Sequence, residues 1–260
     1  MITLPPTLDI ETVFPFLAGR SRTTWRLHPR RASALDLMAS KLGGNMPWPA
    51  EEEFPLCPDR GILAIPVIQL RRDSGVPLPF PDGTDLFQLL WYPAEYEDNH
   101  YLPRLLVRYR TIAALGGCAV LTSVLAEPDM GYTVHECALS VESVVEYPYI
   151  HSLNPNERAR VRAWEDDRGE PTYQYLLSTC PGTKVGGYPD YAGQDDFSPP
   201  LPWEYLLTLS DAEWDGGSAP RWKPAESTWP DGAAIGTYLK AGLNLFLDRT
   251  QTPWRVQGAR

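Results

Sequence analysis

Two short lysine–glycine motifs contain the residues whose types and spacing could do chemistry. Lys41-Leu42-Gly43-Gly44 has a counterpart in Lys184-Val185-Gly186-Gly187, which Tyr188 follows. Paired glycines permit positive φ angles, and successive backbone N–H groups in such a turn can hold an anion beside a lysine. The pattern therefore fits an anion-binding site. It also fits a tight turn at which the backbone passes close to another part of the fold.

Established catalytic and cofactor motifs do not occur in the sequence. A phosphate-binding loop requires GxxxxGK[ST] or GxGxxG, and neither pattern is found. The four histidines are scattered without HExxH spacing, the four cysteines form no CxxC pair, and there is no GxSxG. The sequence therefore predicts no catalytic residue, no metal site and no cofactor, and it leaves open whether the protein is an enzyme.

Tryptophan is concentrated near the C-terminus, where five of the nine residues lie between positions 203 and 254. Trp214-Asp215-Gly216-Gly217 contains the Asp-Gly pair that is typical of a type I′ hairpin turn. Tryptophan rings anchor protein interfaces and also fill cores, so both interpretations stay open here. The candidate binding residues are Lys41, Trp48, Lys184, Gly186, Gly187, Tyr188, Trp203, Trp214, Asp215 and Trp222.

The elements that must position the two motifs resemble each other. Each motif is followed by a proline-rich loop and then by an apolar run, at residues 62–70 and 203–209. A turn and another apolar run follow in both places, at residues 82–91 and 241–247. Self-similarity of this kind indicates an internal repeat.

We therefore expect one domain over residues 1–260 that contains a repeat, residues 34–115 and 178–250, with an insert at 118–177. The 27 prolines argue against long helices and favour many turns. The predicted fold class is α+β, with mainly antiparallel β-sheets, a few short helices and two related lobes that share one core.

Three segments are predicted to be helical. Residues 9–19 form a short helix that ends at a glycine, and residues 29–40 form a second helix with a proline in its first turn. The third begins at Asn154-Pro155-Asn156-Glu157, which supplies an N-cap, a proline at the first position and a capping box.

Further strands are predicted between the two motifs. Residues 102–115 mix apolar side chains with arginines at even spacing, which indicates a strand with one face in water. Residues 119–125 and 132–145 are also strand-like.

The net charge of −10 is uneven along the chain. Residues 1–116 hold 12 basic and 13 acidic residues, whereas residues 117–260 hold 11 and 20. An acidic surface repels phosphate backbones, so we expect no nucleic-acid partner. It would attract a basic protein, although it would also serve solubility alone.

The expected compartment is the cytoplasm. No run approaches 18 apolar residues, so the sequence predicts no membrane span. The first residues lack the basic and apolar regions of a secretion signal. Cysteines without paired spacing are most simply reduced thiols.

Taken together, these motifs resemble the YwqG-like family, a bacterial domain of unknown function, in its actinobacterial branch. The matching stretches are Ser40–Gly44 with Trp48-Pro49, Pro66–Leu70, Gly83–Gln88, Thr183–Pro189, Leu206–Leu209, Trp214–Ser218 and Arg221-Trp222. The resemblance implies an antiparallel α+β fold and no established activity. It also implies a link to immunity proteins, because some members of the family are found beside polymorphic toxins. Lys240-Ala241-Gly242 departs from the Gly-Asp-x-Gly turn of the family.

Two hypotheses about function follow. The first is a cytoplasmic protein-binding module, of the immunity or antitoxin type, that neutralises a basic toxin or effector. The alternative is an enzyme or small-molecule binder in which Lys41 and Lys184 face an anionic ligand in a cleft between the lobes. A structural subunit of a larger assembly is a third possibility, and the oligomeric state stays open.

Overall fold

The computed structural model describes residues 1–99, 101–122, 131–169, 172–190, 202–227, 235–236 and 242–259. The fold is α+β, because most of it is antiparallel β-sheet and its helices are short. The predicted α+β class with mainly antiparallel sheets and short helices is therefore confirmed, whereas the two related lobes stay a prediction. Among the described residues, none of the helices combines the length and the apolar character that crossing a membrane requires.

Sheet A is one of two six-stranded sheets, and all of its neighbouring strands are antiparallel. The strand order is β10 (Glu142–Glu146), β1 (Arg22–Arg26), β11 (Lys184–Gly186), β12 (Glu204–Leu209), β13 (Leu243–Asp248) and β14 (Arg255–Ala259). The apolar runs at 203–209 and 241–247 therefore supply its central strands, as their composition predicts.

Sheet B is also antiparallel throughout. The strand order is β2 (Arg30–Arg31), β9 (Cys137–Ala138), β3 (Lys41–Leu42), β5 (Ile65–Arg71), β6 (Leu86–Tyr96) and β7 (Leu102–Arg110). Proline rarely lies in a central strand, and Pro66 of β5 lies at a shift in register against β6. A small separate sheet pairs β4 (Met46–Trp48) with β8 (Ala119–Leu121).

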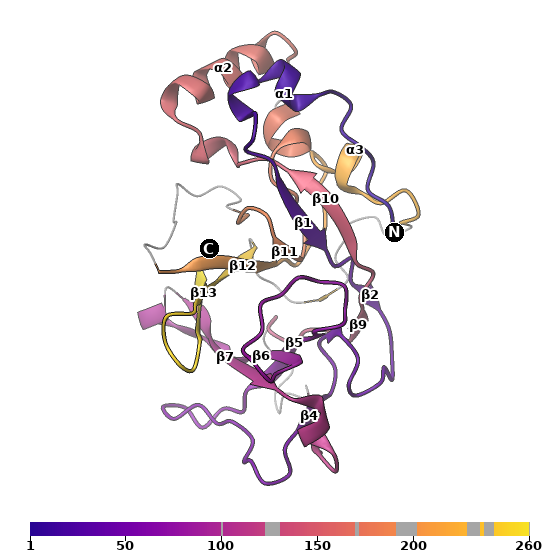
Figure 1. Ribbon diagram of the computed structural model, residues 1–260, viewed down its shortest axis with the longest axis vertical. Helices are drawn as coiled ribbons and strands as arrows, with labels where there is room; N and C mark the ends of the chain where they lie inside the picture. The colour runs from indigo at the N-terminus through magenta and orange to yellow at the C-terminus, as the bar shows by residue number, and fades with distance from the viewer. Residues whose placement is uncertain are drawn as a thin grey trace.

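A two-stranded ribbon, interrupted at residues 27–29 and 139–141, connects the two sheets. β1 of sheet A leads into β2 of sheet B, and β9 of sheet B leads into β10 of sheet A (Figure 1). Arg22 pairs with Glu146, Arg26 with Glu142 and Arg30 with Ala138. The register therefore passes from one sheet into the other without a shift.

The strand orders of the two sheets correspond place by place. The two lysine motifs lie on the third strands, β3 and β11, and β5, β6 and β7 occupy the places of β12, β13 and β14. Within residues 118–177, which we interpreted as an insert, β9 and β10 are strands of the two large sheets. Strand order does not test common sequence origin, so the repeat of residues 34–115 and 178–250 stays a prediction.

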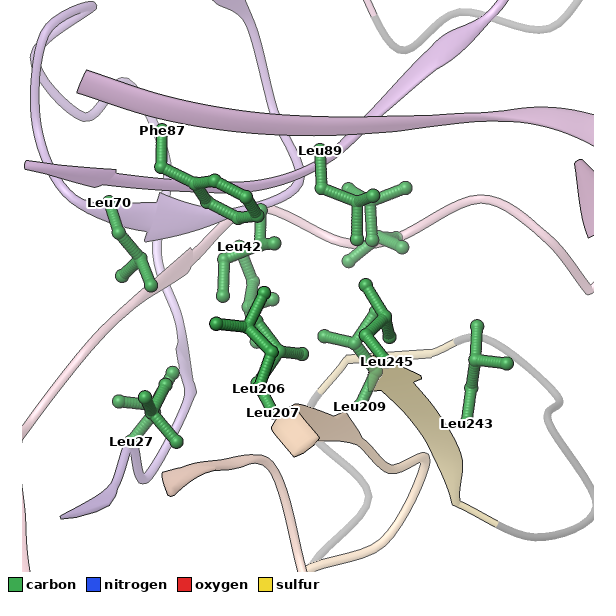
Figure 2. Packing of buried hydrophobic residues seen from close by; sticks show 14 of the residues in the cluster. Leu27, Leu42, Leu70, Phe87, Leu89, Leu206, Leu207, Leu209, Leu243 and Leu245 are labelled. Carbon is green, nitrogen blue, oxygen red and sulfur yellow. The ribbon is translucent and has the colours of Figure 1, made fainter. Parts of the chain in front are cut away.

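The main core lies between the two sheets. Leu42, Phe87 and Leu89 of sheet B face Leu207 and Leu245 of sheet A (Figure 2). All five side chains are buried. Because side chains alternate along a strand, most of the next residues point to the outer faces of the sheets. The exception is Leu206, at the register shift of β12, which also lies in this core (Figure 2).

The helices gather mainly at one end of the molecule, beyond sheet A (Figure 1). They are α1 (Ile10–Val13), η1 (Pro15–Leu17), η4 (Ile150–Ser152), α2 (Pro155–Asp166) and the π-helical turn η5 (Tyr173–Leu177), which share one apolar cluster. At the same end, α3 (Ala219–Trp222) lies beside η5, and elsewhere lie η2 (Glu97–Asn99) and η3 (Ile112–Leu115).

Two of the three predicted helices are confirmed. Residues 9–19 contain α1 and η1, and α2 begins with the predicted capping box between Asn154 and Glu157. The helix expected at residues 29–40 is wrong, because Arg30 and Arg31 pair with β9 and Ala34 has a φ of +57°. Strand pairing with residues more than 100 positions away overrides the local helical pattern there.

Candidate functional site

The anion site of the second lysine motif is occupied by a carboxylate of the same chain. Lys184 Nζ lies 2.8 Å from Glu146 Oε2, and both side chains are fully buried. Glu146 also accepts hydrogen bonds from the backbone N–H groups of Cys180, at 2.7 Å, and Tyr188. The ammonium group and two N–H groups thus satisfy one internal anion.

The second glycine of the motif makes room for that carboxylate. Gly187 has a φ of +76°, and a Cβ at this position would overlap Glu146 Oε1. Gly186 has a similar φ of +72°, but the nearest atoms to its Cβ position are 3.6 Å away. The structure therefore explains Gly187 by a close approach, and Gly186 by backbone conformation alone.

The first motif is built in a related but weaker way. The Lys41 side chain is fully buried, and its Nζ donates a hydrogen bond to the Asp36 carbonyl oxygen at 3.0 Å. Glu136 Oε1 lies 3.8 Å from Nζ, and a Cβ on Gly44 would come within 2.6 Å of the same oxygen. Burial lowers the pKa of Lys41, although Glu136 and Asp36 oppose this effect.

The two lysines do not converge on a shared cleft. Their neighbours Leu42 and Val185 belong to the core between the sheets, so Lys41 and Lys184 point to the outer faces of different sheets. Each ammonium group is satisfied by its own local partners. The structure therefore gives no support to the alternative in which Lys41 and Lys184 face one anionic ligand in a shared cleft.

Three of the candidate tryptophans are core residues. Trp48 and Trp222 have no exposed surface, and Trp214 is only 3% exposed. The indole N–H of Trp222 donates to the Tyr175 carbonyl oxygen at 2.9 Å, and that of Trp48 donates to the Glu53 carbonyl oxygen at 3.2 Å. These rings serve packing in the structure.

Trp203 and Tyr188 are half-buried, and each ring has an arginine over it. The Arg255 guanidinium lies 5.5 Å from the ring centroid of Trp203, and that of Arg22 lies 4.2 Å from the ring centroid of Tyr188. The Tyr188 hydroxyl donates to the Arg20 carbonyl oxygen at 2.6 Å. Both rings are therefore engaged within the chain while keeping some exposed surface.

The hairpin expected at Asp215 is wrong. A type I′ turn requires positive φ at both central residues, and neither Asp215 nor Gly216 has it. Instead the Asp215 carboxylate accepts hydrogen bonds from the N–H and hydroxyl groups of Ser218, at 2.7 and 2.8 Å. The Asp215 carbonyl oxygen accepts from the N–H of Ala219, so this residue begins the turn that leads into α3.

Asp215 and Trp214 line a cavity of about 300 Å³ at one end of sheet A. The cavity lies where β11 begins, β12 ends and β13 begins, since Pro181, Ser210 and Gly242 are also in its wall. Its other described lining residues are Tyr149, Gln174, Tyr175, Thr179, Asp190, Asp211, Ala212 and Ser218. We call it the acidic cavity.

The charge of the acidic cavity has one sign within the described part of its wall. Asp190, Asp211 and Asp215 supply three carboxylates, and no lysine, arginine or histidine is found among the described lining residues. The indole N–H of Trp214 is buried without a hydrogen-bond partner. The described part of the wall therefore combines three carboxylates with the aromatic side chains of Tyr149 and Tyr175.

The acidic cavity contains only two of the ten predicted binding residues, Trp214 and Asp215. Asp190, Asp211 and Tyr175 were missed, because the sequence places them on three separate loops and helical turns. Asp190 is held in place by the Asn244 side chain of β13, which accepts from its N–H at 3.0 Å and donates to its carbonyl oxygen at 2.7 Å. Only the acidic composition of residues 117–260 pointed towards such a site.

A buried histidine lies at the centre of the ribbon. His28 Nδ1 is 2.8 Å from Glu213 Oε2, and Nε2 is 2.9 Å from Glu142 Oε2. Arg30 pairs with the other oxygen of Glu213. The partners of His28 are more than 100 positions away in sequence, so no local pattern could reveal them.

The contacts of His28 and Arg30 with Glu213 link the middle of the ribbon to the loop before α3. Within the ranges that the structure describes, no group of three or more His, Cys, Asp or Glu side chains is arranged to hold a metal ion.

No protein-family model matches the sequence, and no curated protein matches it. The resemblance to the YwqG-like family therefore stays a prediction.

Proposed function

We propose that this protein is a cytoplasmic binding module for a basic partner protein, of the kind that immunity proteins and antitoxins form with the effector that they neutralise. The acidic cavity carries the proposal: three carboxylates surround a hollow at the end of sheet A. A lysine or arginine side chain of a partner would meet negative charge and aromatic rings there.

The distribution of charge supports a basic partner. Residues 117–260, which form most of sheet A and its surroundings, hold 20 acidic and 11 basic residues. A surface of one sign steers an oppositely charged protein and raises the association rate. None of the four cysteines forms a disulfide, which agrees with a reducing compartment.

Affinity capture from the organism that encodes the protein tests the proposal. We expect a basic protein to be recovered in a stoichiometric amount and to be released as salt rises. The variant Asp211→Asn/Asp215→Asn should retain less than about a tenth of it, because each lost charge pair weakens the complex. Co-expression with the captured protein should relieve its toxicity.

A matched pair of charges elsewhere provides the control. Asp73 and Asp82 are exposed and lie in turns next to strands of sheet B. Asp73→Asn/Asp82→Asn removes the same net charge far from the cavity wall and should leave capture unchanged. Equal losses in both variants, or recovery of chaperones alone, would contradict the proposal.

A further inference from the structure

The edge of sheet A at β10 has an unusual groove. β10 is the last strand in the order of the sheet, and its only strand partner in the described chain is β1. Residues 142–145 all line one hollow of about 380 Å³. Successive strand residues point to opposite faces, so a hollow that touches four in a row runs along the edge of the strand.

The opposite wall of the groove is the N-terminal segment, residues 3–10. This segment is tied to β10 near its two ends: the Thr3 N–H donates to Glu142 Oε1 at 2.8 Å, and the Tyr147 hydroxyl donates to Glu11 Oε1 at 3.0 Å. Among the described residues, no backbone hydrogen bond joins the segment to β10. Pro5 and Pro6 have no N–H to donate.

Apolar side chains are exposed beside this unpaired edge. Leu4 is 44% exposed and Val145 is 50% exposed, and both line the groove. Ile2 and Val141, just outside it, are 64% and 37% exposed. Exposed apolar side chains next to a free strand edge are the features that bind an extended peptide, which adds to the sheet through backbone hydrogen bonds.

Arg221 of α3 gives the groove a charge preference. It is only 6% exposed, and it donates to the carbonyl oxygens of Leu176 and Val145, the latter at 3.4 Å. Its Nε has no acceptor, and no carboxylate forms an ion pair with it in the described part of the chain. Burial lowers its pKa to about 10, which agrees with a missing counter-ion.

The two carboxylates of the groove are already engaged within the chain. Asp9 accepts hydrogen bonds from Glu11 and Thr12 at the start of α1. Glu142 accepts from Thr3 and lies 2.9 Å from His28. The charged group that lacks an opposite charge is therefore the Arg221 guanidinium, and the group that would complement it is a carboxylate.

We propose that the groove between residues 3–10 and β10 binds an extended segment of a partner protein. The segment adds to sheet A as a strand beside β10 and places an aspartate or glutamate side chain at Arg221. This site is separate from the acidic cavity, so either proposal can fail without the other.

Selection from a phage-displayed library of random 12-residue peptides tests the proposal on the full chain. We expect enrichment of peptides in which apolar residues alternate and an acidic residue recurs. Synthetic peptides with amidated C-termini should protect the amides of Ser143 and Val145, which face away from β1, from hydrogen exchange. Replacing the acidic residue of the peptide by its amide should weaken binding about tenfold.

Two protein variants locate the peptide. Arg221→Gln should weaken binding at least about tenfold, whereas Arg162→Gln on exposed α2 should not. Arg221 also stacks on Trp222, 4.0 Å from the ring centroid, so Leu4→Lys provides a second variant that leaves the core untouched. Leu56→Lys, at a similarly exposed leucine near sheet B, is its control.

Three results would overturn the proposal. They are enrichment without an acidic residue, unchanged affinity in both groove variants, and binding that leaves the β10 amides unprotected. Protection of β10 that grows with protein concentration in the absence of peptide would instead show a second copy of the chain in the groove, and would also overturn it.

Discussion

At the scale of single residues, the lysine–glycine motif is an internal anion site. Its parts are the ones that an anion-binding nest requires: a lysine, positive φ angles and converging N–H groups. The anion is Glu146, which reaches the motif from β10. The ion pair between Lys184 and Glu146 therefore links β10 to β11, the third strand of sheet A.

Replacing Lys184 should show how much its ion pair with Glu146 contributes to the free energy of unfolding. Lys184→Met leaves the fully buried Glu146 without its counter-ion, and we expect a loss of about 3–5 kcal/mol in the free energy of unfolding. Lys41→Met should cost less, because Glu136 is 3.8 Å away and part of its side chain is in water. Urea denaturation of both variants measures the difference. A larger loss for Lys41→Met would contradict this interpretation.

The two glycines after Lys184 provide a sharper comparison. Gly186→Ala should cost about 1–2 kcal/mol, because alanine must adopt a left-handed backbone conformation where there is otherwise space. Gly187→Ala has the same strain and also displaces the Glu146 carboxylate, so the loss should reach about 3–5 kcal/mol. Equal shifts in the urea midpoints of the two variants would show that only the backbone conformation matters.

At the scale of elements, local sequence patterns predict some of the helices and strands but not others. The cap residues of α2 lie within a few positions of one another, and so do the apolar residues within each of the strands β5, β12 and β13. These patterns are therefore visible in the sequence. Arg30 and Arg31 instead take their strand conformation from β9. The acidic cavity was likewise hidden, because its walls come together only when β11, β12 and β13 are in register.

The start of α2 gives a prediction with a neighbouring control. The Asn154 side chain accepts from the Glu157 N–H at 3.0 Å, and Glu157 accepts from the Asn154 N–H at 3.0 Å. Asn154→Ala should therefore reduce the free energy of unfolding by about 0.5–2 kcal/mol. Asn156→Ala, at an exposed position in the first turn, should change it little. Thermal denaturation followed by circular dichroism compares the two.

The tie between β10 and the N-terminal segment predicts a pH dependence. Burial alone would raise the pKa of Glu142, but hydrogen bonds from Thr3 and His28 outweigh it and hold the pKa below its usual value. A carboxyl group whose pKa is lowered by folding stabilises the protein above its unfolded pKa. That contribution is lost as pH falls through the folded pKa.

In Glu142→Gln, the free energy of unfolding should therefore fall less steeply than in the wild type as the pH is lowered. Free energies of unfolding measured from neutral pH to about pH 3 would show the wild type losing more stability than the variant over the range in which carboxyl groups titrate. Glu204→Gln, at an exposed glutamate of β12, is the control. If the free energy of unfolding of Glu142→Gln depended on pH as steeply as that of the wild type, other carboxylates would be the cause of the acid sensitivity.

At the scale of the whole molecule, each half of the chain completes the sheet of the other half. β1 comes from the N-terminal half but lies in sheet A between β10 and β11. β9 comes from the C-terminal half but lies in sheet B between β2 and β3. The shared core between the sheets and the pairing of His28 with Glu142 and Glu213 add to this exchange. We therefore expect the two sheets to unfold as one cooperative unit.

Fragments of the chain test this interdependence. Residues 1–116 lack β9, and residues 117–260 lack β1, so each fragment leaves a strand edge and an apolar face of its sheet exposed to water. We expect each fragment alone to be unfolded and the two co-expressed fragments to associate into the native fold. Circular dichroism and NMR spectra of the fragments measure this directly. In the intact chain, tryptophan fluorescence and circular dichroism should follow one coincident urea transition. A cooperative transition in residues 1–116 alone would mean that sheet B folds without its borrowed strand, and that the ribbon joins two already stable parts.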